Sequence, residues 1–212
     1  MPLPPIDLPD GPTGRILEAA REGLFRDRYS GLTMDSLAFA LGMSKKTIYL
    51  YFPSKDAIVS AILAAMGATL RRQIPELLEG PGTFPDKLER ILGLVGRHFG
   101  VMGPGFLQDL QRFAPHIARE LEQLKERNVP LLFGRVLQLG VEHGLVRPDI
   151  GVNFAIEYWL QVIKGMHEPA VLDRLGLSGG EVFEKGLDLF FRGLLTPEGR
   201  RQSRWGELGT AD

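Results

Sequence analysis

The chain contains no cysteine among its 212 residues. This absence excludes a disulfide framework, a thiolate zinc site and a cysteine nucleophile. The four histidines, His98, His116, His143 and His167, stand at no metal-ligand spacing, so neither a metal site nor a cofactor is expected. The sequence also lacks a glycine-rich phosphate loop and a nucleophile elbow, so we do not expect an enzyme.

Long apolar runs are missing as well. A membrane-spanning helix needs about 18 uninterrupted apolar residues, and the richest stretch, residues 150–163, is interrupted by Asn153, Glu157 and Gln161. The first twelve residues carry five prolines and no cationic or apolar leader pattern. We therefore expect a soluble, cytoplasmic protein.

A strong excess of charge of one sign is also absent. The formal net charge is −1, with nine Lys or Arg against seven Asp or Glu in residues 1–72 and 16 against 19 in residues 73–212. Because these differences are small, the placement of the cations is more informative than their sum. At 44% apolar and 24% charged residues, the composition is typical of a globular protein.

Strand patterns are scarce, whereas apolar residues recur at helical spacing between Gly, Pro and Ser or Thr residues. We therefore predict an all-α fold. The N-terminal helices are expected at residues 14–28, 34–41, 45–51 and 55–70. The later ones are expected at residues 84–101, up to 113, 117–143 with a kink at Pro130, 152–172 and 180–195.

The segment from Thr33 to Lys55 has the pattern of a helix-turn-helix. Thr33 and Ser44 are placed as N-caps of two short helices, which are separated by Gly42. In the second helix, Ile48 and Phe52 are expected to face inward. The expected outward residues are Lys45, Lys46, Thr47, Tyr49 and Leu50.

These outward side chains combine cations, a hydroxyl group and apolar surface. Such a set can contact phosphates, base edges and thymine methyl groups in the major groove of DNA. The alternative is that the two lysines are simply exposed to solvent, as charged residues on a helix usually are. The caps, the turn and the inward residues around them favour a DNA-recognition helix instead. Tyr51 is expected to be half-buried with its hydroxyl group outward.

The run SKKTIYLYFPSKD at residues 44–56 closely resembles the signature of the TetR family of transcriptional repressors. ILEAA at 16–20 and TMDSLA at 33–38 match it too, so that the resemblance covers about 50 residues. One departure is Arg28, where the family usually has glycine. The resemblance implies phosphate contacts from Thr33, Tyr51 and Lys55, and base or groove contacts from Ser44, Lys45, Lys46, Thr47 and Tyr49.

Two C-terminal segments are unusually apolar. Residues 152–166 are apolar nearly all round, and the last helix is similarly rich, so each must be covered on more than one side. Either both lie deep in the core of one chain, or they pack against their copies in a dimer, the arrangement that the family resemblance implies. The residues predicted for the interface are Ile156, Trp159, Ile163, Phe183, Leu187, Phe190, Phe191 and Leu194.

Aromatic and methionine side chains in the middle of the chain suggest an apolar ligand cavity. The candidates are Phe99, Met102, Phe106, Phe113, Phe133, Trp159 and Met166. For any one of them, an ordinary core position is the competing interpretation.

Taken together, the expectation is a disordered arm at residues 1–12, a DNA-binding domain at 13–60, an effector-binding and dimerisation domain at 61–195, and a flexible tail at 196–212. Such a protein would bind a palindromic operator as a homodimer at the nucleoid, and a small apolar effector would release it. The competing hypotheses are an activator or architectural DNA-binding protein without an effector, and a helical carrier or enzyme with a vestigial helix-turn-helix.

Overall fold

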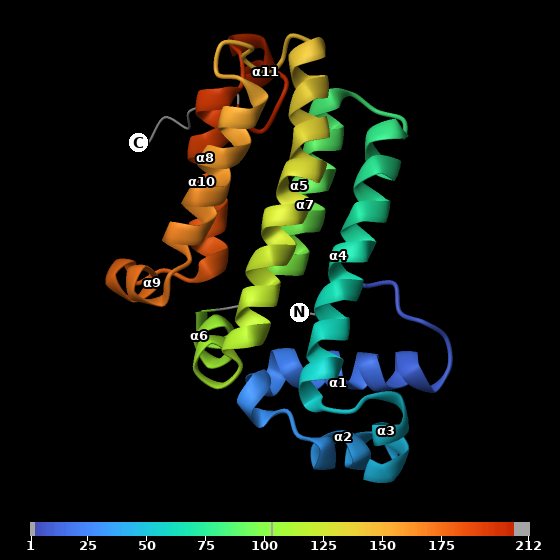
Figure 1. Cartoon of the computed structure of the whole chain (residues 1–212). Helices are drawn as coiled ribbons and strands as arrows, with labels where there is room; N and C mark the ends of the chain where they lie inside the picture. Colours follow the sequence, from blue (N-terminus) through green and yellow to red (C-terminus); the bar gives the residue numbers. More distant parts are fainter. Residues whose placement is uncertain (1–2, 103, 206–212) are drawn as a thin grey trace. The chain divides into compact units, whose positions relative to one another are not determined.

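The computed structural model describes residues 3–102 and 104–205, and these are helical almost throughout (Figure 1). In the described ranges the one β-type pairing is an isolated bridge between Val146 and Leu195. The predicted all-α fold is therefore confirmed. The chain divides into two compact units, with unit 1 formed by Met1–Leu70 and Arg97–Leu124 and unit 2 by Arg71–Gly96 and Lys125–Asp212.

Unit 1 is a cluster of helices around one apolar core. It contains α1 (Pro12–Gly31), α2 (Met34–Leu41), α3 (Lys45–Tyr51), the first part of α4 (Lys55–Glu79), the end of α5 (Phe84–Gly100), α6 (Pro104–Phe113) and the first part of α7 (Pro115–Glu142). Residues from α1 to α4 share the core with Phe106, Leu110 and Ile117. The compact unit is thus larger than the segment 13–60 expected from the sequence, because α6 and its neighbours pack into it.

The helix-turn-helix has the caps that the sequence indicates. The Thr33 hydroxyl oxygen accepts a hydrogen bond from the Ser36 amide at the start of α2, and the Ser44 hydroxyl oxygen accepts one from the Thr47 amide at the start of α3. Gly42 ends α2 in the left-handed conformation, with φ of 62°, which glycine adopts without strain. These local signals fix the position of α3 in the sequence.

Residues 3–12 of the N-terminal arm pack within unit 1, contrary to the expectation of disorder, and residues 1 and 2 lie outside the described residues. Pro4 is buried, and its carbonyl oxygen accepts a hydrogen bond from the buried Arg21 guanidinium. The Asp7 amide donates to the Thr69 hydroxyl oxygen at 2.8 Å. The arm also lies close to Gly14, where a Cβ would stand 1.8 Å from a backbone oxygen of the arm. These contacts hold the arm in place, and no helical pattern in the sequence predicts them.

Unit 2 contains α8 (Val152–Met166), α9 (Pro169–Leu175), α10 (Gly179–Leu194) and α11 (Pro197–Arg201), with the remaining parts of α4, α5 and α7. Helix α8 packs against α10. The single helix expected at residues 152–172 is in fact two helices, α8 and α9. The break falls before Pro169, because a proline disfavours the helical conformation in the residue that precedes it.

Of the tail expected to be flexible at residues 196–212, residues 196–205 pack on unit 2, and residues 206–212 lie outside the described residues. The Thr196 hydroxyl oxygen caps α11 by accepting from the Gly199 amide. The Trp205 ring is buried and stacks on Phe191 with ring centroids 4.8 Å apart. A Cβ at Gly199 would stand 2.1 Å from the Leu145 carbonyl oxygen, so this close approach requires glycine.

Helix α4 extends further than residue 70, where the sequence predicts its end, and runs through Pro75 to Glu79. Among the described residues it is the one helix whose length and mean hydropathy, 1.2, reach those of a membrane span. Half of that stretch is buried inside the fold. The hydropathy of α4 is accordingly that of a core helix.

Arg28 interrupts α1 with a backbone conformation that L-residues rarely adopt, φ 64° and ψ 179°. At this position the family that the sequence resembles usually has glycine. Its guanidinium lies against α6, 2.6 Å from where a Cβ of Gly105 would be. The kink therefore combines a strained backbone with a tight contact between α1 and α6.

We expect Arg28→Gly to raise the free energy of unfolding by about 1 kcal/mol, because glycine adopts this conformation without strain. Arg26→Gly is the matched control, since Arg26 lies in the regular part of α1 and its loss should lower stability by about 1 kcal/mol. Thermal and denaturant unfolding of both variants checks the sign. A loss of stability in both would contradict the strain.

Candidate nucleic-acid interface

The orientation of α3 is set by the two apolar residues that hold it. Ile48 is completely buried and Phe52 is nearly so, and both belong to the core of unit 1. Lys46 and Leu50 lie two residues before and after Ile48, which places them about 200° around the helix. They therefore point away from the core, as their exposure also shows.

Most of the residues predicted to contact DNA are exposed. Thr33, Ser44, Lys45, Lys46, Tyr49 and Tyr51 are exposed, whereas Thr47 and Lys55 are half-buried. Tyr51 is more exposed than the sequence suggests, at 42%. The structure thus brings the residues of α2 and α3 together, but it gives Lys55 a different environment.

The lysines of α3 differ in their partners. The Lys45 ammonium forms an ion pair with Asp35 of α2 at 2.9 Å, and this hydrogen bond raises the pKa of Lys45. Both side chains are exposed, and an exposed ion pair stabilises a protein little, so the ammonium can exchange its partner for a phosphate. Lys46 has no ion-pair partner among the described residues.

Lys55 is engaged within unit 1. Its ammonium donates a hydrogen bond to the Tyr29 carbonyl oxygen at 3.0 Å and lies 3.9 Å from the centre of the Tyr29 ring. Burial lowers the pKa of Lys55, while the nearby Asp56 and Asp109 carboxylates oppose that shift. In this structure Lys55 therefore fastens the start of α4 to the end of α1, a role that the sequence does not suggest.

A polar network around this point was missed by sequence reasoning. Asp109 of α6 is buried and accepts hydrogen bonds from the Ser30 amide at 2.6 Å and the Ser30 hydroxyl group at 2.7 Å. Asp56 accepts from the Tyr29 hydroxyl group and contacts His116 of α7 at 2.8 Å. Burial is the main cause that raises the pKa of Tyr29, and the hydrogen bond to Asp56 raises it further. Because its members come from α1, α4, α6 and α7, no local pattern indicates the network.

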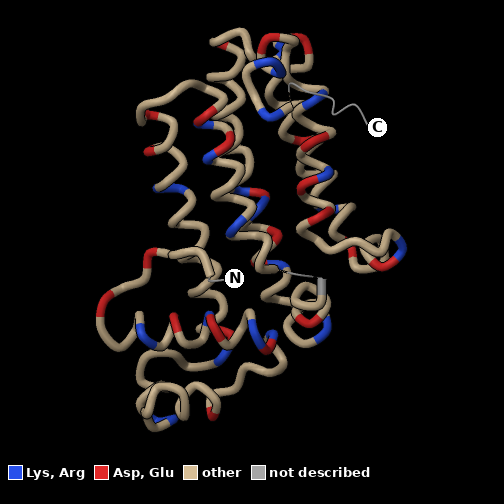
Figure 2. Tube along the Cα trace, turned by 180° about the vertical axis from the view of Figure 1, so that it is seen from behind, with Lys and Arg blue, Asp and Glu red and all other residues tan. Residues whose placement is uncertain are grey.

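The charges of the chain do not gather on one face. Figure 2 shows Lys and Arg interspersed with Asp and Glu along most helices. The interface is therefore a local arrangement of side chains around α3, and the chain as a whole, with its net charge of −1, is not polycationic.

The seven residues predicted for a ligand cavity fall into three groups. Met102 and Phe106 are buried in the core of unit 1, with Phe99 partly buried against it, and Phe133 and Trp159 are buried in unit 2. Phe113 and Met166 are exposed, at 52% and 37%. The last two are corrections, because side chains open to solvent do not line an enclosed cavity.

The residues predicted for the dimer interface lie at different depths within the chain. Ile156, Trp159, Leu187, Phe190, Phe191 and Leu194 are buried within their own chain, while Ile163 and Phe183 are half-buried. The large apolar side chains that α8 and α10 expose are Phe154, Tyr158, Met166 and Leu189. A helix that is apolar nearly all round does not reveal which face turns inward. The stacking of the Trp205 ring on Phe191 was also not predicted from the sequence.

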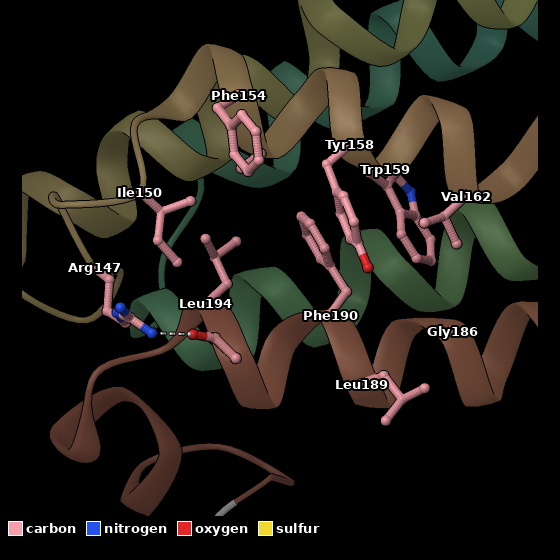
Figure 3. A pocket seen from close by; sticks show the side chains of 12 residues that line it. Arg147, Ile150, Phe154, Tyr158, Trp159, Val162, Gly186, Leu189, Phe190 and Leu194 are labelled. Carbon is pink, nitrogen blue, oxygen red and sulfur yellow. Dashed lines mark hydrogen bonds between the residues drawn. The ribbon is translucent and has the colours of Figure 1, made fainter.

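A groove of about 370 Å³ runs between α8 and α10 on this exposed surface (Figure 3). Tyr158 and Phe190 stack within it, and its two glycines are Gly186 and Gly193. Arg147 lies at its edge and donates to the Gly193 carbonyl oxygen at 3.0 Å. The groove is therefore apolar and open, and two of the residues that α10 contributes to it carry no side chain.

Comparisons with known proteins agree with the geometry of α1 to α4. Residues 16–62 match the family model described as bacterial regulatory proteins, tetR family. The chain is similar to the uncharacterized HTH-type transcriptional regulator YvaF of Bacillus subtilis (strain 168), with 22% identity over 82% of this chain and 92% of that protein. The match thus extends well beyond the helix-turn-helix.

Solved structures are similar to this chain over most of its length. A transcriptional regulator from Cytophaga hutchinsonii ATCC 33406 superposes with a TM-score of 0.66 at 20% identity, covering 88% of this chain and 100% of that one. A structure described as the molecular basis for control of antibiotic production by bacterial hormones has a TM-score of 0.65 at 25% identity, covering 86% and 96%.

We expect Lys55→Met to lower the free energy of unfolding by about 1 kcal/mol, because it removes a charge-assisted hydrogen bond and the contact with the Tyr29 ring but keeps the aliphatic stem. Lys46→Met is the control and should change stability by less than about 0.5 kcal/mol, because Lys46 is exposed. Denaturant unfolding measures both. Equal stability of the two variants would show that the Lys55 contacts contribute nothing.

Proposed function

The chain belongs to the TetR family of bacterial transcriptional regulators, and on this basis we propose that it is a repressor. It binds a palindromic operator as a homodimer, with α3 of each copy in the major groove, and leaves the DNA when a small apolar molecule binds. It acts in the cytoplasm, at the nucleoid.

The observation that carries this proposal is the outward face of α3. Burial of Ile48 turns Lys46 and Leu50 to solvent, and Thr47 and Tyr49 flank them. A short helix with such a face, held by a preceding helix and a glycine turn, is the reading element of helix-turn-helix proteins. Lys45 and Lys46 supply cations for phosphates or guanine edges.

The groove between α8 and α10 supports the homodimer. Phe154, Tyr158 and Leu189 expose 65%, 53% and 76% of their surface, and large exposed apolar patches mark interaction sites in soluble proteins. A Cβ at Gly193 would meet only open space, so that a second helix pair can approach closely there. A two-fold dimer buries the same patch on both copies.

The release step uses the junction between α1 and α6. Asp109 of α6 holds Ser30 near the end of α1, and Arg28 packs against Gly105 of α6. A ligand that displaces α6 would therefore also displace α1, which packs against α2. A relative of the same fold is described in terms of control by bacterial hormones, which supports a diffusible effector. The buried Met102 and Phe106 beside this junction favour an apolar one.

We expect binding to DNA from upstream of its own gene to be selective over random DNA and sensitive to salt. Lys46→Ala in both copies of the dimer should reduce the slope of log K against log salt by about two units, because each lost phosphate contact contributes about 0.9. Fluorescence anisotropy at several salt concentrations measures the slope.

Arg90→Ala is the control for this experiment, because it removes one exposed positive charge from α5 in unit 2. Its slope should equal that of the unaltered protein. An unaltered slope in Lys46→Ala, or binding without sequence preference, would favour the carrier or enzyme with a vestigial helix-turn-helix.

We expect Leu189→Glu to convert the dimer into a monomer at micromolar concentration, because two carboxylates would be buried across the two-fold axis. Leu131→Glu is the matched control, since Leu131 is a similarly exposed leucine, at 66%, on α7. Light scattering coupled to size-exclusion chromatography gives the mass. A dimeric Leu189→Glu protein would place the interface elsewhere.

A further inference from the structure

Leu50 is the most exposed of the large apolar side chains on α3. It exposes 77% of its surface, against 50% for Tyr49 and 42% for Tyr51. It lies opposite the buried Ile48, on the face that stands furthest from the core of unit 1. A leucine in this position packs on little in its own chain, and it lies on the face of α3 that the proposed function turns towards the major groove.

The chemistry of the major groove restricts what leucine can contact there. Leucine has no hydrogen-bonding group, so it cannot pair with phosphate oxygens or with the donors and acceptors of the base edges. The one apolar group that the bases present in the major groove is the 5-methyl group of thymine. We propose that Leu50 is a specificity-determining residue that packs on a thymine methyl group of the operator, an inference that rests on the proposed function.

The surroundings of Leu50 favour DNA over a second protein as its partner. Lys46 lies one helical turn before it on the same face and has no ion-pair partner among the described residues. A cation beside an exposed leucine suits a duplex, whose phosphates flank the base edges. An apolar protein surface would instead leave this ammonium without a partner.

The spacing of the two side chains also predicts a feature of the operator. Four residues of helix advance by roughly 6 Å, and successive base pairs are about 3.4 Å apart. Where α3 lies along the groove, the thymine that Leu50 contacts is therefore about two base pairs from the base or phosphate that Lys46 contacts.

The test removes the methyl group from the DNA and the leucine from the protein. Duplexes that the full-length protein selects from a random pool supply the operator, and each thymine pair related by the two-fold axis is replaced by uracil, which differs only in lacking the methyl group. Dissociation constants are then measured by fluorescence anisotropy for the unaltered protein and for Leu50→Ala.

At one symmetric pair of positions, we expect uracil to weaken binding of the unaltered protein by about 4-fold per half-site, or about 15-fold in total, as the loss of one buried methyl group implies. Leu50→Ala should bind the thymine and uracil operators equally. Its folding is checked by thermal unfolding, which should not change because the side chain is exposed.

Phe39→Ala is the matched control, because Phe39 of α2 is an even more exposed apolar side chain, at 92%. It should keep the full preference for thymine at that position. Leu50→Ala with an undiminished preference, or no position at which uracil weakens binding, would overturn the inference while leaving the proposed repressor intact. Failure of the unaltered protein to select any sequence would overturn both.

Discussion

The burial of one side chain, Ile48, is the constraint on which the DNA-reading surface depends. Helix α3 has only seven residues, too few to be stable alone in water, so its conformation and orientation come from packing. With Ile48 fixed inside, the geometry of the α-helix decides which residues face outward and which flank them. A polar residue at position 48 would therefore remove the whole surface at once, although residue 48 itself touches no solvent.

Several polar residues near α3 that are predicted to contact DNA also form hydrogen bonds within the fold. Thr33 and Ser44 already use their hydroxyl oxygens to cap helices, and Lys55 donates to the Tyr29 carbonyl oxygen. Lys46 is the cation of the surface that the fold leaves uncommitted among the described residues. A signature motif thus contains residues that build the helix-turn-helix as well as residues that contact its partner, and only burial and hydrogen bonding separate the two kinds.

The bounds of α2 and α3 were predicted correctly because local residues determine where these helices begin and end. Thr33, Gly42, Ser44 and Pro53 each fix a helix boundary through capping or steric exclusion, so α2 and α3 have the bounds expected. The position of α3, and the exposure of its lysines, could therefore be predicted without any knowledge of tertiary contacts.

The contacts that join distant segments could not be predicted in this way. The Asp109–Ser30 pair spans 79 positions, and the stacking of Trp205 on Phe191 depends on where a polar tail turns back. In α8 and α10 the apolar residues surround the helix, so composition does not distinguish the inward Trp159 from the outward Tyr158. The sequence indicates that such helices are covered on several sides, but only packing decides what covers each side.

The nearly neutral charge of the chain bears on how it distinguishes one DNA sequence from another. With a net charge of −1, and with Lys45 already paired to Asp35, the long-range attraction to a polyanion is weak. Phosphate contacts are also the same for every sequence, so they cannot carry selectivity. The contacts that remain are those to base edges, and in the proposed complex these fall to Thr47, Tyr49 and Leu50 of α3. In the proposed complex, selectivity therefore rests on a few side chains of α3, whose orientation the burial of Ile48 sets.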